Sequence, residues 1–130
     1  AFDRSELSTL RRVVERAQRM VRIGNWVTTW EREVAEGDFT SGIVAHALEQ
    51  GIVSADELRA SREDGGDQQV AATVRTIHEH DVEDVFLRQW SRELAAAREF
   101  EGACGSVDVG SYLDGIETVM EYHLATRGLK

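Results

Sequence analysis

The chain has 130 residues, a hydrophobic share of 42% and a formal net charge of -9. This length fits one domain, and no apolar run approaches the ~18 residues that a membrane-spanning helix needs. The negative charge argues against nucleic acid and anionic membranes as partners, because both require clustered cations. Cys104 is the only cysteine and no secretion-signal pattern follows Ala1, so we expect a reducing compartment, the cytoplasm.

The first predicted helix is long. The absence of proline, the frequent helix punctuation and the lack of alternating strand patterns predict an all-α fold. The first helix is expected over residues 3–35, with Gly37 just past its end. Its buried stripe is predicted to comprise Leu7, Leu10, Val14, Ala17, Val21 and either Val27 or Thr28, at spacings of three and four residues.

Two short helices are predicted next. One begins at residue 40 or 41 and runs to residue 50, where Gly51 stops it. The other begins at a capping-box pattern, in which Ser54 caps the helix and Glu57 reaches back to the backbone. That second helix is expected to falter at residues 64–67, an Asp-Gly-Gly-Asp sequence.

The remaining chain is also predicted to be helical. A helix is expected over residues 67–101, and the phase of its apolar stripe changes at the polar residues 78–81. A kink or break is therefore predicted there. After a glycine-containing loop, a last helix is expected over residues 108–126. The whole chain, residues 1–130, is interpreted as a single all-helical segment.

Three oxygen-bearing side chains recur every fourth residue within the first helix: Asn25, Thr29 and Glu33. Since an α-helix turns by about 100° per residue, positions four apart differ by only ~40° and share a face. An amide oxygen, a hydroxyl and a carboxylate are hard ligands of the kind that Mg²⁺ prefers. The spacing therefore predicts a Mg²⁺ site formed by Asn25, Thr29 and Glu33.

This triad resembles the second metal-binding motif of class I terpene synthases. The family carries Asn or Asp, Ser or Thr, and Glu at the same spacing on a long helix. It usually has an aliphatic residue two positions after the first ligand, here Val27, and a basic residue just before the Glu, here Arg32. Trp26 departs from the pattern, because an acidic residue usually stands at that position. The resemblance implies that Arg32 binds diphosphate.

The C-terminal residues extend the resemblance. Residues 112–116 and the residues that follow are similar to the last helix of the family, which ends in a diphosphate-binding Arg-Tyr pair. Arg127 matches the arginine, whereas Gly128 stands in place of the tyrosine. The aspartate-rich first metal motif of the family lies well upstream of the triad, and residues 1–24 do not contain it. The chain therefore resembles the C-terminal half of the class I terpenoid synthase fold, a helical bundle.

The resemblance implies an enzyme, a carbon-oxygen lyase acting on a diphosphate. Its reaction would be the Mg²⁺-dependent ionisation and cyclisation of a linear prenyl diphosphate, farnesyl or geranylgeranyl, to a terpene. We expect this chain alone to be inactive, and we expect the missing N-terminal half to be supplied as a second chain, or the exposed apolar face to cause self-association. No membrane insertion is expected.

Several features also have simpler interpretations. Trp26 and Trp30 can wall an apolar pocket, but core packing is the more frequent role of such a pair. His78, His80 and Asp81 resemble a metal cluster, but His at positions i and i+2 of a helix point to different faces, which favours solvated or kink-associated residues. The alternative for the whole chain is a non-catalytic helical bundle that acts as a protein-protein interaction module.

Overall fold

Six helices make up the secondary structure in a computed structural model, which describes residues 4–63, 65–105 and 107–126. The helices are α1 (Arg4–Ala35), α2 (Gly42–Glu49), α3 (Ala55–Arg62), α4 (Asp67–Glu79), α5 (Val82–Arg98) and α6 (Val109–Thr126). Within these described ranges there is no strand, so the predicted all-α class is confirmed. The expected start of the first helix at Asp3 lies outside the described residues.

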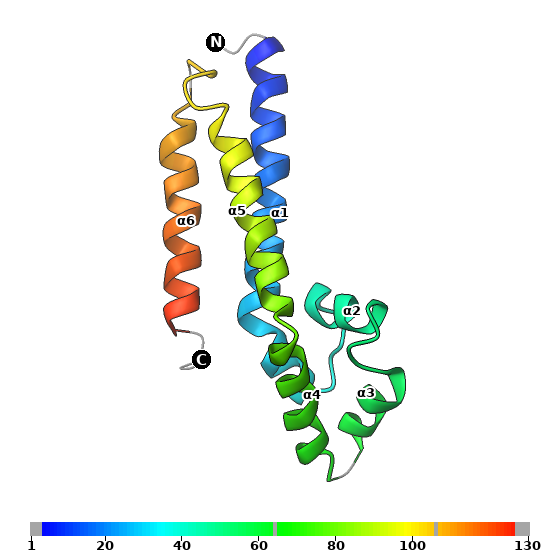
Figure 1. The fold of residues 1–130 in the computed structure, drawn as a ribbon. Coiled ribbons are helices and arrows are strands. Elements are labelled where there is room, and N and C mark those ends of the chain that lie inside the picture. The colour runs from blue at the N-terminus through cyan, green and yellow to red at the C-terminus, as the bar shows by residue number, and fades with distance from the viewer. Residues whose placement is uncertain (1–3, 64, 106, 127–130) are drawn as a thin grey trace. The chain divides into compact units, whose positions relative to one another are not determined.

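The chain divides into two compact units. The terminal unit comprises Ala1–Gly24 and Arg88–Lys130, and the middle unit comprises Asn25–Leu87. Both α1 and α5 contribute residues to each unit. In chain order α2, α3 and α4 follow α1 and precede α5, and all three belong to the middle unit (Figure 1).

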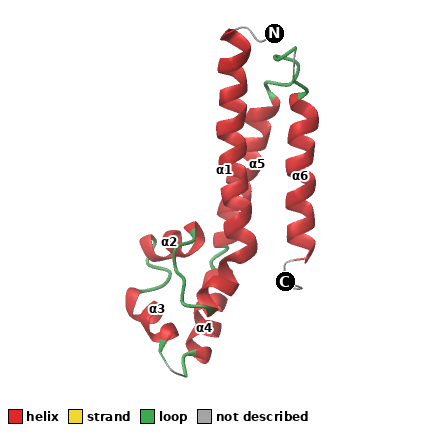
Figure 2. Ribbon diagram, turned by 180° about the vertical axis from the view of Figure 1, so that it is seen from behind, coloured by secondary structure: helices red, strands yellow, loops and turns green. Residues whose placement is uncertain are grey.

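Three helical segments form the terminal unit. The first part of α1, the last part of α5 and the whole of α6 lie side by side, and successive segments run in opposite directions (Figures 1 and 2). Its buried apolar residues are Val13, Ala17, Met20, Ile23, Trp90, Leu94, Ala97, Cys104, Val109, Leu113 and Met120. Ion pairs support this core, since Glu93 of α5 binds Arg16 at 3.0 Å and Arg19 at 3.1 Å.

The buried stripe of α1 differs from the predicted one. Residues of α1 that are buried are Val13, Ala17, Met20, Ile23, Val27, Trp30 and Val34. Ala17 and Val27 were correctly predicted, but Leu7 is 51% exposed and Val21 is 60% exposed. The helix carries apolar residues along two neighbouring lines, and both fit a helical period. Packing against other helices, which periodicity cannot reveal, decides which line is buried.

Side-chain caps define the starts of α2 and α3, the two short helices of the middle unit. Ser41 is the N-cap of α2 and accepts a hydrogen bond from the backbone N–H of Val44 at 3.3 Å. Gly51, with φ of 71°, follows the end of α2 in the left-handed region. At α3 the predicted capping box is confirmed, because Ser54 accepts from the backbone of Glu57 and the Glu57 carboxylate accepts from that of Ser54.

A break separates α4 from α5, as residues 78–81 predicted. The chain turns at Asp81, which has a φ of 54°. A positive φ is uncommon outside glycine, and Asp tolerates it better than most residues. His80 stabilises the end of α4 through a contact of 2.9 Å between Nδ1 and the backbone oxygen of Thr76. The helix predicted over residues 67–101 is therefore two helices, α4 and α5. The second of them ends at Arg98, three residues before the predicted end.

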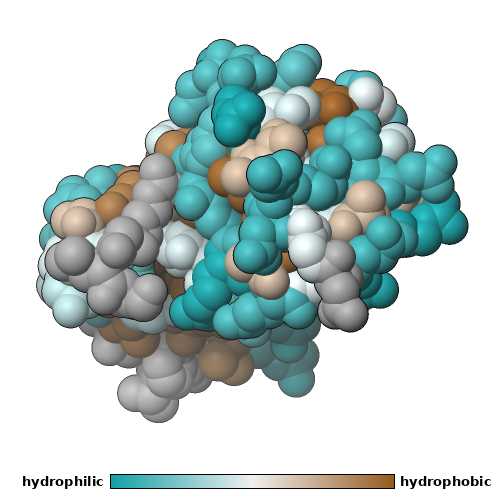
Figure 3. Space-filling view, turned by 90° about the horizontal axis from the view of Figure 1, so that it is seen from below, coloured by the Kyte–Doolittle hydropathy of each residue, from teal (hydrophilic) through white to brown (hydrophobic). Residues whose placement is uncertain are grey.

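Hydrophilic side chains dominate the face drawn in Figure 3, and hydrophobic ones show in several separate places. The large apolar residues with the greatest exposure are Leu7, Val21, Leu48, Val85, Tyr112, Val119 and Tyr122. Among the described residues, no helix combines the length and the apolar character that crossing a membrane requires.

Candidate metal and diphosphate site

The predicted metal triad lies on the second part of α1, within the middle unit. Asn25 is exposed, whereas Thr29 and Glu33 are half-buried. The hydroxyl oxygen of Thr29 lies 3.1 Å from Oε1 of Glu33 and 2.7 Å from the backbone oxygen of Asn25. The helix therefore brings two of the three predicted ligand atoms into direct contact.

The hydroxyl of Thr29 can donate a hydrogen bond to Glu33 or to the backbone oxygen of Asn25. A hydroxyl has one proton and two acceptor lone pairs, so Thr29 donates to only one of its two neighbours at a time. When it donates to the backbone oxygen of Asn25, its lone pairs and those of Glu33 face each other. Two neighbouring ligands of an octahedral Mg²⁺, each bound at about 2.1 Å, lie ~3 Å apart. The separation of 3.1 Å between Thr29 and Glu33 fits that edge.

Asn25 lies on the expected helix face, but its side chain forms no hydrogen bond with Thr29 or Glu33. Its carboxamide makes no hydrogen bond within the part of the chain that the structure describes. Because Asn25 precedes Thr29 by one turn of the same helix, its side chain lies on the same face. The donor set of Asn25, Thr29 and Glu33 is chemically suited to Mg²⁺, and only the last two are already adjacent.

Of the two arginines expected to bind diphosphate, the structure describes only Arg32. Arg32 is exposed, and its Nε lies 3.8 Å from Oε1 of Glu36, one turn along the helix. An exposed pair of this kind contributes little to stability, so the guanidinium can exchange Glu36 for another anion. Arg127 lies outside the described residues.

The two tryptophans of α1 pack against neighbouring helices of the middle unit. Trp30 is fully buried, and its indole N–H donates to Oε1 of Glu83 at 2.7 Å. The ring of Trp26 meets Phe86 edge-on at 5.8 Å. It also lies against Gly42, where an added Cβ would approach the ring to 2.5 Å. These contacts are those of core packing, the alternative considered from the sequence.

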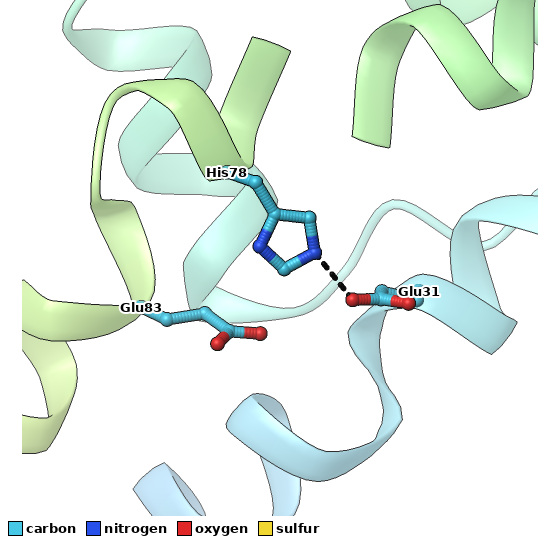
Figure 4. A group of neighbouring side chains, drawn as sticks. All are labelled: Glu31, His78 and Glu83. Carbon is cyan, nitrogen blue, oxygen red and sulfur yellow. Dashed lines mark hydrogen bonds and ion pairs between the residues drawn. The ribbon is translucent and has the colours of Figure 1, made fainter. Parts of the chain in front are cut away.

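A second group of possible ligands was not predicted. Glu31 of α1, His78 of α4 and Glu83 of α5 each offer one ligand atom, and these atoms lie within 4.8 Å of one another (Figure 4). Nε2 of His78 lies 2.5 Å from Oε1 of Glu31. Glu31 precedes His78 by 47 residues, so no local spacing could have revealed the group.

The sequence favoured solvated or kink-associated roles for His78, His80 and Asp81, and all three side chains are exposed. His80 and Asp81 belong to the break between α4 and α5 and do not join the group. His78 does, because it lies on the last turn of α4 and faces α1. The predicted divergence of the two histidines is thus the reason that only His78 meets the carboxylates.

Comparisons with known proteins add no relationship: no family model, curated protein or solved structure matches this chain.

Proposed function

We propose that this chain supplies the second metal-binding motif of a class I terpene synthase. The observation that carries the proposal is the pair of ligand oxygens on Thr29 and Glu33, 3.1 Å apart. That pair lies on the face of a long helix that also carries Asn25, and the donor set suits Mg²⁺. The fold resemblance to the C-terminal half of such an enzyme is part of the same proposal.

The proposed reaction depends on stabilising the negative charge of the diphosphate leaving group. Bound Mg²⁺ would stabilise negative charge on the departing diphosphate of a linear prenyl substrate, farnesyl or geranylgeranyl. Asn25, Thr29 and Glu33 would hold one ion, and the exposed guanidinium of Arg32 would bind a diphosphate oxygen in place of Glu36. Cleavage of the carbon-oxygen bond leaves an allylic cation, which cyclises and loses a proton. Arg127 is the second proposed diphosphate ligand.

The proposal includes a partner and a compartment. An aspartate-rich helical half, or a second copy of the chain, would cover apolar side chains that the terminal unit leaves exposed: Leu7, Val21, Tyr112, Val119 and Tyr122. Exposed apolar residues of this size favour association. We propose that the chain is inactive without the aspartate-rich half. We also propose that it acts in the cytoplasm, where the buried thiol of Cys104 stays reduced.

The test compares Glu33→Ala with Glu36→Ala in the complete enzyme, assayed with a prenyl diphosphate over a range of Mg²⁺ concentrations. Glu33→Ala should abolish turnover, because a charged ligand is lost, whereas Glu36→Ala should retain it. Thr29→Val and Thr28→Val form a second matched pair. Thr29→Val should lose turnover because it removes a proposed ligand, whereas Thr28→Val should retain it. Wild-type rates for Glu33→Ala at low Mg²⁺ would overturn the proposal.

A second candidate function is a non-catalytic module that binds another protein. The exposed apolar residues of the terminal unit favour it, and they equally suit an enzyme half. Metal dependence separates the two candidates. For an interaction module, the triple variant of Asn25, Thr29 and Glu33 retains every activity. For the terpene synthase, the same variant loses Mg²⁺-dependent binding of inorganic diphosphate.

A further inference from the structure

We infer that Glu31, His78 and Glu83 form a binding site for a first-row transition metal ion, with Zn²⁺ as its best match. The three side chains come from α1, α4 and α5 and converge within the middle unit (Figure 4). The site is independent of the proposed Mg²⁺ triad and uses none of its residues.

The ligand types select the metal. Imidazole nitrogen suits zinc, copper, iron and nickel, whereas Mg²⁺ and Ca²⁺ prefer oxygen ligands. One histidine with two carboxylates supplies three protein ligands, and water can complete a tetrahedral shell. Because the site lies at the surface, with His78 41% and Glu31 51% exposed, an ion can enter from solvent.

The geometry needs only side-chain movement. Ligand atoms around a tetrahedral Zn²⁺ bound at about 2.1 Å lie ~3.4 Å apart. The three ligand atoms here lie within 4.8 Å of one another, so closure requires shifts of about 1 Å, which the exposed side chains of Glu31 and His78 can make. The contact of 2.5 Å between His78 and Glu31 is replaced on binding, because both atoms then donate lone pairs to the ion.

An outer layer already orients two of the ligands. The indole N–H of buried Trp30 donates a hydrogen bond to Oε1 of Glu83 at 2.7 Å and so fixes the direction of that carboxylate. The ring of Trp30 also packs on the imidazole of His78, with centroids 5.2 Å apart. Hydrogen bonds and packing of this kind orient metal ligands in known sites. The site is therefore more than a group of charged surface residues.

The location of Glu31 separates this site from the proposed Mg²⁺ triad. Glu31 and Glu33 are two positions apart on α1, so their side chains point in directions about 160° apart. An ion held by Glu31, His78 and Glu83 would connect α1 with α4 and α5 across the break at Asp81. Its expected role is structural, because it would link three helices and raise the stability of the middle unit with the logarithm of the ion concentration above Kd.

The test is a calorimetric titration of the full chain, freed of metal with a chelator, with Zn²⁺ alone. We expect one Zn²⁺ per chain, a rise in Tm with Zn²⁺ concentration, and a change in Trp30 emission. His78→Gln and Glu31→Gln should each weaken binding at least ~10-fold, because each removes a direct ligand. Glu83→Gln should also weaken binding, while it keeps an oxygen that can accept from Trp30.

Matched controls distinguish this site from other ligands. His80→Gln and Glu79→Gln change exposed neighbours outside the group, and Thr29→Val disrupts the proposed Mg²⁺ triad. All three should bind Zn²⁺ as the unmodified chain does. Circular dichroism without metal confirms that each variant folds. Equal Zn²⁺ affinity for His78→Gln and the unmodified chain, or an equal loss in His80→Gln or Thr29→Val, would overturn the inference.

Discussion

The two units of this protein have different interiors. Among the described residues, all buried polar side chains belong to the middle unit: Ser41, Ser61 and Thr73. The described interior of the terminal unit contains only apolar residues and Cys104, and the carboxylate of its Arg16–Glu93–Arg19 ion pairs is half-buried at the edge of that interior. The middle unit also holds polar contacts between helices, including Trp30 with Glu83 and Arg62 with the backbone oxygen of Gly37.

This difference associates each unit with one kind of role. The short helices of the middle unit require caps and polar contacts to define their ends, and both proposed metal sites lie among those contacts. The long helical segments of the terminal unit bury a continuous apolar seam, and they leave further apolar residues exposed on α1 and α6. Metal binding is therefore expected in the middle unit and association in the terminal unit.

Loss of volume in either core should have the largest effect on stability. Leu113 in the terminal unit and Ile77 in the middle unit are both fully buried. Replacing either by Ala should lower the free energy of unfolding by about 2–5 kcal/mol, because a cavity remains. Urea denaturation followed by circular dichroism measures both. A loss for Ile77→Ala far below that for Leu113→Ala would show that the polar contacts, rather than the apolar core, stabilise the middle unit.

Two tryptophan-to-phenylalanine variants measure how much the hydrogen bond between Trp30 and Glu83 contributes to stability. Trp30→Phe and Trp90→Phe both remove ring volume from a buried position, one in each unit. Only Trp30 donates to a carboxylate, that of Glu83. The hydrogen bond to a charged group should make Trp30→Phe costlier by about 1.5–3 kcal/mol. Equal unfolding midpoints in guanidinium for the two variants would remove this distinction between the units.

Two helix caps of the middle unit should differ in their contributions to stability. Ser54→Ala removes an exposed cap of α3 and should cost about 1 kcal/mol. Ser41→Ala removes the cap of α2 at a position only 2% exposed. Its cost should be closer to 2 kcal/mol, because water reaches the freed N–H of Val44 poorly. Thermal unfolding of both variants measures the order, and a larger loss for Ser54→Ala contradicts it.

The smallest expected effects on stability come from the ionisation of two carboxyl groups, Asp38 in the middle unit and Asp108 in the terminal unit. The hydroxyl and then the backbone N–H of Thr40 lower the pKa of Asp38 below 3.8. The backbone N–H and then the hydroxyl of Ser111 lower the pKa of Asp108 below 3.8. A lowered folded-state pKa adds stability that is fully present above the unfolded-state pKa and is lost as the pH falls through the folded-state value.

Removing one hydroxyl donor tests each cause. Thr40→Val removes the main donor to Asp38, so the pKa of Asp38 should rise towards its ordinary value. Ser111→Ala removes the lesser donor to Asp108 and keeps the main one, the backbone N–H of residue 111, so the pKa of Asp108 should rise but stay below its ordinary value. Carbon-detected NMR titration of the two carboxyl groups measures both values. An unchanged pKa of Asp38 in Thr40→Val, or a pKa of Asp108 that returns fully to its ordinary value in Ser111→Ala, would contradict the assigned causes.

The amino-acid sequence by itself determined the helical class and most helix ends. Ser41, the capping box at Ser54 and the glycines at 37 and 51 act within a few residues along the chain, so their patterns are visible without a structure. The break near Asp81 was predicted for the same reason. The alignment of Thr29 with Glu33 also follows from helix geometry alone, and their contact agrees with it.

Only the tertiary structure decided which apolar line of α1 is buried and which side chains meet across helices. Leu7 and Val21 satisfy the helical period as well as the buried residues do, and the neighbouring helices leave them exposed. Glu31, His78 and Glu83 are brought together by the packing of α1 against α4 and α5. Periodicity describes a helix's own surface, whereas contacts between distant segments depend on how several helices pack at once.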